Sequence, residues 1–272
     1  MSERFSRNEA LFGGAGQAAV AATTVAIVGL GGLGSHVAQQ LAYLGLGGFG
    51  LIDGDIVTDS SLNRLIGAID RDVAAQTSKV EVAERMIKAI NSSASIVTID
   101  ERLADERAEA AIAAADVVFG CLDRDLPRLL LTEICARLAK PYFDLATDTE
   151  GEGAEVRYGG RVVLCDGSRC LVCLKMLDQA EMNRDAMSPE QRATHDRIYG
   201  VRREAIEGTG PMVVSVNGVV ASLAVTEFIC LATGLRAPIG HLIYRGERAT
   251  VGQVRDLPEP DCYYCTLVWG GT

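Results

Sequence analysis

The sequence of 272 residues is short of positive charge, with 26 Lys and Arg against 36 Asp and Glu and a net charge of −10. A surface that wraps nucleic acid needs clustered cations to neutralise phosphates, so we expect no nucleic-acid partner. No apolar run follows the polar start MSERFSRNEA, which predicts no signal peptide. The longest apolar stretch, residues 211–234, is interrupted by Asn217 and Glu227, so it predicts a buried helix and not a membrane span. We therefore expect a cytoplasmic protein without a membrane partner.

Histidine is also scarce. The three histidines, His36, His195 and His241, lie in unrelated parts of the sequence, and none has an evident catalytic partner. The hydride-transfer constellation of a dehydrogenase is therefore not visible. Internal repeats and low-complexity segments are absent too, which favours one continuous globular fold.

Apolar strand-like runs alternate with amphipathic helical segments over residues 24–147. This alternation predicts an α/β fold with a doubly wound, Rossmann-like, mostly parallel sheet. After about residue 150 the pattern changes to strands that we expect to continue the sheet in antiparallel fashion. We predict a single domain over 1–272, made of an N-terminal helical arm (1–22), a nucleotide-binding half (23–150) and a second half (151–272).

A glycine turn follows the first strand and carries the pattern G-x-G-x-x-G at Gly29, Gly31, Gly32 and Gly34. Such glycines let the backbone approach a phosphate, which the start of the next helix then stabilises. Asp53 ends the second strand, where an acid accepts hydrogen bonds from ribose hydroxyls. The turn by itself suits NAD as well as ATP.

Later residues favour ATP. Asp55, Arg64 and Lys79 follow Asp53, and cations beside the ribose acid suit a reaction that releases pyrophosphate. Asp123 comes just after the fourth strand, at the edge of the sheet where ligands bind, and a carboxylate there suits Mg²⁺. The sequence thus predicts a site for ATP and Mg²⁺.

Two C-x-x-C pairs, Cys170 with Cys173 and Cys262 with Cys265, supply the four thiolates of a structural Zn²⁺ site. A thioredoxin-like redox pair and unconnected thiols are the alternatives. A closed four-cysteine site leaves no open coordination position, so the predicted metal has a structural role.

Taken in order, these motifs resemble the ubiquitin-activating enzymes and their bacterial ThiF/MoeB/HesA relatives. The segments that carry the resemblance are RFSRNEALFGGAGQ, VAIVGLGGLGSH, LIDGDIVTDSSLNR, SKVEVAERM, GCLDRDLPR, both C-x-x-C pairs and GPMVVSVNGVVASLAV. The resemblance implies an adenylyltransferase that binds ATP and Mg²⁺ and activates the C-terminal di-glycine carboxylate of a ubiquitin-like or sulfur-carrier protein.

The resemblance also implies roles for individual residues. The glycine turn, Asp53, Asp55 and Asn63 would hold the nucleotide. Arg64 and Lys79 would stabilise phosphate charge, and Asp123 would bind Mg²⁺. The catalytic set is completed by Arg7, which would reach across a homodimer to the neighbour's phosphates. Residues 176–210 would form the crossover loop above the partner's tail.

The sequence departs from the family pattern at Ser61, where relatives often have a nucleotide-contacting asparagine, and at Arg124. It also has no cysteine between Cys173 and Cys230, the region where relatives that form a thioester keep theirs. Cys121 is nearest to the predicted site, and a packing role suits it better. We therefore expect adenylation without a loop-cysteine thioester.

Other functions remain open at this point. Adenylation of a small peptide is the nearest alternative, whereas activation of a modified tRNA nucleoside suits neither the zinc cysteines nor the acidic charge. An NAD-dependent oxidoreductase or a non-catalytic scaffold would belong to a different class. The presence of Arg7, Arg64, Lys79 and Asp123 argues against both.

Overall fold

Strand β1 (Thr24–Val28) is apolar at every position after Thr24, and both of its faces are buried. Val25 and Ile27 belong to one hydrophobic core, whereas Ala26 and Val28 belong to a second core on the opposite face. A parallel strand covered on both faces carries a continuous apolar run. The sequence TVAIV therefore belongs at the centre of a sheet.

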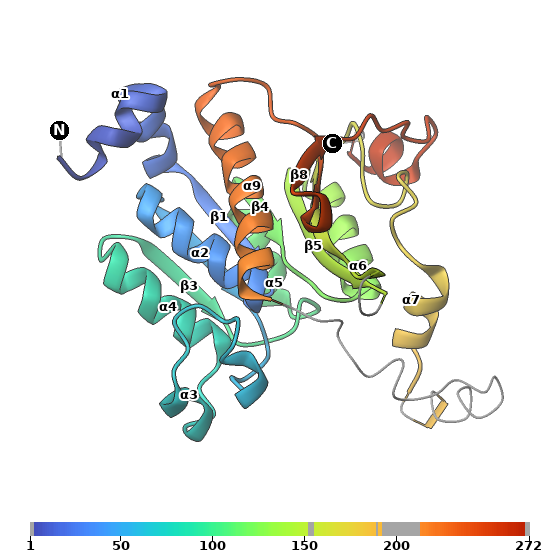
Figure 1. Cartoon of the computed structure of the whole chain (residues 1–272). Helices are drawn as coiled ribbons and strands as arrows, with labels where there is room; N and C mark the ends of the chain where they lie inside the picture. Colours follow the sequence, from blue (N-terminus) through green and yellow to red (C-terminus); the bar gives the residue numbers. More distant parts are fainter. Residues whose placement is uncertain (1–2, 152–154, 189, 192–212, 270–272) are drawn as a thin grey trace.

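The computed structural model describes residues 3–151, 155–188, 190–191 and 213–269. It contains an eight-stranded sheet of order β3-β2-β1-β4-β5-β6-β7-β8, in which β1 to β5 are parallel and β6 to β8 antiparallel (Figure 1). The other strands are β2 (Gly48–Ile52), β3 (Ser95–Ile99), β4 (Val117–Gly120), β5 (Tyr142–Glu150), β6 (Arg157–Cys165), β7 (His241–Arg245) and β8 (Thr250–Gln253). This topology confirms the predicted fold class.

Helices cover both faces of the sheet (Figure 1). One face is covered by α2 (Gly32–Leu44), α4 (Lys79–Ile90) and α9 (Val214–Thr233), and the other by α5 (Glu106–Ala114) and α6 (Asp125–Arg137). The shorter helices are α3 (Asp70–Ala74) and α7 (Gln179–Asp185). Each C-x-x-C pair lies on the α5/α6 side, where three of the four cysteines join the core.

Helix α9 matches the helix predicted from the apolar stretch. It packs against α2, β5 and β6, and its one internal acid, Glu227, is buried in a bidentate pair with Arg236, with both N–O distances at 2.7 Å. Of the helices in the described ranges, α9 is the one long and apolar enough to span a membrane by length and composition alone. Its packing is that of a core helix of this sheet.

Helix α1 (Ser6–Ala22) leads directly into β1 and is kinked at Gly13, where φ is +77°. Gln17 holds it to the end of α2 by donating a hydrogen bond of 2.8 Å to the Leu44 carbonyl. Gly16 meets Thr233 at the last turn of α9. The helix therefore lies at the edge of the sheet where the parallel strands begin (Figure 1).

Candidate active site and metal centre

The order of the strands reverses between β1 and β4, because the chain adds β2 and β3 on one side of β1 and then β4 and β5 on the other. In open α/β sheets, ligands bind in the crevice at the carboxyl ends of the strands beside this point. The turn from β1 to α2 and the turn from β4 to α6 both lie there. The crevice is therefore the candidate active site.

The glycines of the β1–α2 turn have distinct physical roles. Gly29 has φ of +89°, and a Cβ atom there would lie 2.6 Å from the Cys121 carbonyl oxygen. A Cβ on Gly34 would lie 1.9 Å from the Gly29 oxygen. Gly31 has open space around it, with no atom within 4 Å of such a Cβ. Close packing thus requires two of the glycines, while Gly31 leaves room for a ligand at the start of α2.

Asp53 follows β2 and holds the glycine turn in place. Its Oδ2 accepts a hydrogen bond of 2.6 Å from the Leu30 amide, and its Oδ1 accepts one of 2.9 Å from the Asp55 amide. Burial raises the pKa of Asp53, although the Lys79 charge opposes this shift. Lys79, at the start of α4, lies 2.6 Å from Asp55 and 3.9 Å from Asp53. The predicted nucleotide-binding acids and the predicted phosphate lysine therefore form one cluster.

Arg64 reaches the same turn from the segment after β2. Its Cδ atom lies 3.4 Å from the position of a Cβ on Gly32. Its guanidinium donates hydrogen bonds to the Ser60 carbonyl and to the side chain of Asn63, and the described residues give it no acidic partner. Arg64 thus brings a positive charge that no carboxylate neutralises to the start of α2.

Asp123 lies in the turn between β4 and α6 and is exposed. Within the described chain its carboxylate makes no ion pair or hydrogen bond, so it is available to a cation at the crevice. The turn is held by Arg128, which donates hydrogen bonds of 2.8 and 3.2 Å to the Leu122 carbonyl. Arg128 is itself buried, 3.7 Å from the buried carboxylate of Asp144. Arg124, where relatives often have asparagine, lies 3.4 Å from Asp185 of α7.

Three residues near the crevice were missed by the sequence analysis as site residues. Arg128 and Asp144 support the Asp123 turn, and Asn217 lies against Gly32 with its amide nitrogen 2.1 Å from the position of a Cβ there. Asn217 could have been found, because it and Glu227 interrupt the apolar stretch that predicts this helix. Arg128 and Asp144 carry no comparable signal, since charged residues are common in amphipathic segments.

Arg7 is not brought to this site. It lies on α1, at the opposite edge of the sheet, is exposed, and has no ion pair within the described part of the chain. Helix α9 extends from the crevice to α1 and has 20 residues, which corresponds to a length of about 30 Å. Arg7 therefore does not reach the crevice of its own chain. Of the predicted crossover loop, residues 192–210 and 189 lie outside the described residues.

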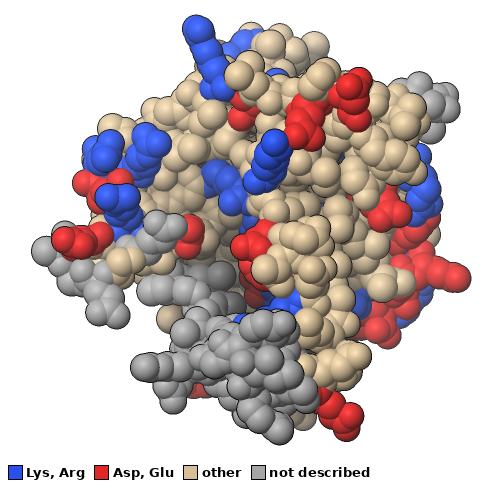
Figure 2. Space-filling view, turned by 90° about the vertical axis from the view of Figure 1, so that its right-hand side faces the viewer, with Lys and Arg blue, Asp and Glu red and all other residues tan. Residues whose placement is uncertain are grey.

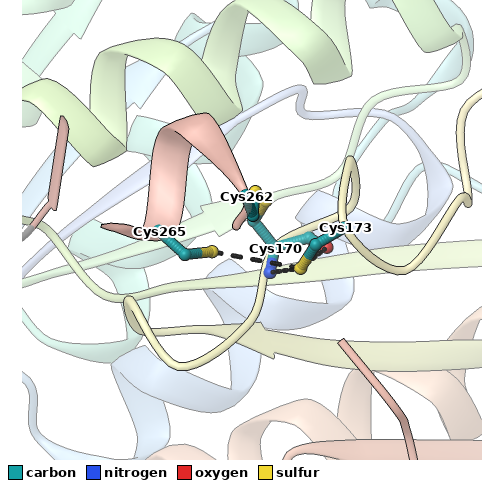
Figure 3. A group of neighbouring side chains, drawn as sticks. All are labelled: Cys170, Cys173, Cys262 and Cys265. Carbon is teal, nitrogen blue, oxygen red and sulfur yellow. Dashed lines mark hydrogen bonds between the residues drawn. The ribbon is translucent and has the colours of Figure 1, made fainter. Parts of the chain in front are cut away.

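The four paired cysteines form one cluster (Figure 3). Cys170 and Cys173 come from the turn after β6. Cys262 directly precedes the C-terminal helical turn at Tyr263–Val268, and Cys265 lies within it. The four sulfur atoms all lie within 4.8 Å of one another, with Cys170–Cys262 at 3.6 Å and Cys173–Cys265 at 3.9 Å. Tetrahedral zinc with Zn–S bonds of about 2.3 Å separates its sulfur ligands by about 3.8 Å.

This spacing fits zinc. Burial raises the pKa of the Cys170 thiol to about 12, so a bound cation is needed to hold the thiolate form near neutral pH. The other cysteines do not join the cluster. Cys135, Cys165 and Cys230 are buried, and burial raises the pKa of the Cys121 thiol, which suits packing better than nucleophilic chemistry.

A pH effect follows from Asp53. Its raised pKa means that it becomes protonated at higher pH than an ordinary aspartate, whose pKa is about 3.9. The protonated acid accepts hydrogen bonds less well, so we expect affinity for ATP to fall on acidification before an ordinary aspartate would titrate. Calorimetric titration of ATP at several pH values measures this. Asp53→Asn is the control for protonation of ATP itself, and a wild-type pH profile identical to that of Asp53→Asn would contradict the prediction.

Comparisons with known proteins identify the family of this chain. The sequence matches the ThiF family over residues 5–263. It is 29% identical to the maize adenylyltransferase and sulfurtransferase MOCS3-1 over 97% of this chain and 52% of that protein. It is also 29% identical to the ThiS adenylyltransferase of Escherichia coli, over 84% of this chain and 79% of that protein. The chain spans about half the length, or less, of the MOCS3 relatives from maize and mouse.

Solved structures show the same fold. The E. coli enzyme MccB, solved with ATP, superposes with a TM-score of 0.70 at 21% identity, over 97% of this chain and 75% of that chain. MccB with N-formylated MccA gives a TM-score of 0.74, also at 21% identity and over the same shares of the two chains. The match over residues 5–263, the glycine turn at the switch point and the four-cysteine cluster together show that this chain belongs to the ThiF family.

Proposed function

We propose that the protein adenylates the C-terminal di-glycine carboxylate of a ubiquitin-like or sulfur-carrier protein. One observation carries the proposal: in a ThiF-family fold, the glycine turn, the unneutralised Arg64 and the free carboxylate of Asp123 meet at the carboxyl ends of β1 and β4. These groups suit a nucleoside triphosphate, because the turn can bind a phosphate, Arg64 can offset its charge and Asp123 can hold Mg²⁺. An NAD-dependent oxidoreductase or a scaffold gains no support from this set.

The reaction needs no general base. A carboxylate oxygen of the tail attacks the α-phosphorus of ATP, a new O–P bond forms, and the bond from that phosphorus to the bridging oxygen breaks. Pyrophosphate leaves with the electron pair, and no proton moves. Catalysis then consists of positioning and of stabilising phosphate charge. Arg64, Lys79 and the start of α2 supply that stabilisation in this chain.

Asp123 is the residue that we expect to hold Mg²⁺. Magnesium is usually bound by one or two carboxylates together with substrate phosphates, and when bound it neutralises developing phosphate charge. The exposed Asp123 carboxylate, which no described cation pairs, fits this arrangement. Asp53 is already occupied by two backbone amides, so it suits the ribose better.

The partner is inferred from the relatives. One relative, from E. coli, is named as the adenylyltransferase of the sulfur carrier protein ThiS. Another, from Haloferax volcanii, is named as a SAMP-activating enzyme and is 32% identical over 49% of this chain. A peptide C-terminus is the second candidate, because MccB was solved with MccA.

The surface charge bears on the class of partner. On the face of the molecule that carries α7, the basic side chains of the described residues form no continuous band, and acidic side chains gather along the right-hand edge (Figure 2). This distribution and the relatives support a protein partner and no nucleic-acid partner, and we separately propose a cytoplasmic location.

We further propose a homodimer in which Arg7 acts on the neighbour's site. Arg7 lies too far from its own crevice, and α2 and α9 present an outer surface without free charge, lined by His36, Gln40, Ser222 and Thr226. An uncharged surface of two parallel-lying helices suits contact with a second copy. This contact would bring Arg7 of one chain toward the crevice of the other.

Complementation tests the action of Arg7 in trans. We expect Arg7→Ala and Asp123→Ala each to lose activity, and a refolded equal mixture of the two to regain about a quarter of wild-type activity, since half of the dimers are mixed and each has one intact site. Adenylation of a di-glycine-ended partner is the readout. A mixture no more active than its components would show that Arg7 acts in cis or not at all.

Mass spectrometry tests the adenylation itself. Purified protein, ATP and Mg²⁺ are incubated with single di-glycine-ended ubiquitin-fold proteins, and the partner is examined for an added adenylyl group. We expect the group on the C-terminal residue of one partner, and not on a matched partner that lacks the last glycine. Labelling of a small peptide instead would favour the second candidate.

A further inference from the structure

Ser61 stands where relatives often have an asparagine, and its hydroxyl is used within its own turn. Ser61 is buried, and its Oγ accepts a hydrogen bond of 3.2 Å from the Thr58 amide and lies 3.0 Å from the Thr58 hydroxyl. These bonds form a capping arrangement at the short helix of residues 59–61. Ser61 therefore supplies no amide group to the crevice.

Asn217 offers a side-chain amide to the crevice from helix α9. It lies in the first turn of α9, is 1% exposed, and its Oδ1 accepts a hydrogen bond of 3.3 Å from the Thr147 hydroxyl of β5. Its amide nitrogen Nδ2 is buried and has no hydrogen-bond partner among the residues that the structure describes. A buried amide without a partner costs about 1–3 kcal/mol, so a ligand that satisfies it gains binding energy.

The position of Nδ2 relates it to the substrate. It lies against Gly32, the first residue of α2, at 2.1 Å from the position of a Cβ there, and the Arg64 Cδ lies 3.4 Å from the same point. Gly32 is at the helix start where an anion binds, and Thr147 belongs to the strand beside β4. Asn217 thus stands between the predicted phosphate site and β5.

We infer that the side-chain amide of Asn217 donates a hydrogen bond to an anionic oxygen at the reacting centre, an inference that rests on the proposed adenylation. The oxygen belongs to the α-phosphoryl group or to the acyl group joined to it, and both are acceptors of the same chemistry. A hydrogen bond from a neutral amide to an anionic oxygen is stronger than one between neutral groups. Asn217 is thereby a substrate-binding residue on α9, an element that the sequence motifs of the nucleotide site do not include.

Binding measurements on two variants test this. Asn217→Asp keeps the shape and the acceptor for Thr147 but removes the donor and adds a negative charge. Asn217→Ala removes the donor and the acceptor for Thr147 together and adds no charge. Three probes are titrated: AMP, ATP with Mg²⁺, and glycylglycine joined to adenosine through a sulfamate, an unreactive analogue of the acyl-adenylate. We expect Asn217→Asp to weaken binding by about 100-fold and Asn217→Ala by about 10-fold for the affected probes.

The pattern of losses identifies the oxygen. Weaker binding of all three probes would assign the bond to the α-phosphoryl oxygen, and weaker binding of the acyl sulfamate alone would assign it to the acyl oxygen. Both results support the inference. Asn91→Asp is the matched control, because Asn91 is also buried and donates its amide to the Leu46 carbonyl, away from the crevice. It should lower the melting temperature and leave all three affinities unchanged.

Two negative results are distinguishable. If wild-type protein binds the probes and folded Asn217→Asp and Asn217→Ala bind them equally well, the inference is wrong and the proposed adenylation is unaffected. If wild-type protein binds none of the probes, the proposed function is wrong, and the inference that rests on it is wrong as well. Melting temperatures of all variants show whether each one is folded at the temperature of titration.

Discussion

Replacing Asp123 by alanine is expected to lower the rate of adenylate formation by at least ~10³-fold, because the site loses the carboxylate that we assign to Mg²⁺. The residue is exposed and makes no bond within the described chain, so its loss removes no structural contact. We expect an unchanged melting temperature and a modest change in affinity for ATP, which Asp53 and the glycine turn hold independently. Single-turnover formation of adenylated partner measures the rate.

Two further variants sharpen this prediction. Asp123→Asn keeps the shape and removes the charge, and should be nearly as inactive as Asp123→Ala. Asp100 is the matched control, since it too is an exposed aspartate after a parallel strand, β3, at the same edge of the sheet, but two strands away from the crevice. Asp100→Ala should retain full activity. An active Asp123→Ala enzyme would remove Asp123 from the mechanism.

Loss of the four-cysteine cluster is expected to have the largest effect on stability. The cluster ties the turn at Cys170 and Cys173 to the C-terminal turn at Cys262 and Cys265, and three of these cysteines are part of the core. Structural zinc sites contribute their binding energy directly to folding. We therefore expect Cys170→Ser or Cys265→Ser to lose the metal and to lower the melting temperature by about 10 °C or more.

Metal analysis of purified protein together with calorimetry checks this. We expect one zinc per chain in the wild type and in Cys230→Ala, a control that removes a buried thiol outside the cluster. Strong chelators should lower the melting temperature of both proteins to that of Cys170→Ser. Protein without zinc whose stability chelators do not change would favour unconnected thiols, and a disulfide between paired cysteines would favour a redox pair.

Much of the fold could be predicted from the sequence, because its local signals agree with its tertiary structure. The run TVAIV is a doubly covered strand, and the apolar stretch around Asn217 is a core helix. The strands expected after about residue 150 continue the sheet in antiparallel fashion as β6 to β8. Spacing also predicted the cluster of cysteines, although the pairs lie far apart in sequence. Each of these sequence signals lies within a short segment, and the sheet brings the segments together.

The site could be predicted less completely. The glycine turn and Asp53 follow from local motifs, but Arg128 and Asp144 support Asp123 through a carbonyl and a buried ion pair that join α6, β5 and the β4 turn. Such contacts depend on packing between distant segments and leave no spacing pattern. The role assigned to Arg7 is not observable within one chain at all, since Arg7 lies at the far edge of the sheet.

The most direct test of the central proposal is exchange of labelled pyrophosphate into ATP. Exchange requires reversible cleavage at the α-phosphate, so it reports the proposed step and no other. With purified protein, Mg²⁺ and a panel of di-glycine-ended ubiquitin-fold proteins, we predict exchange that depends on one partner and is absent in Asp123→Ala. Tight binding of NADH in place of ATP, with no exchange for any protein or peptide partner, would contradict the proposal.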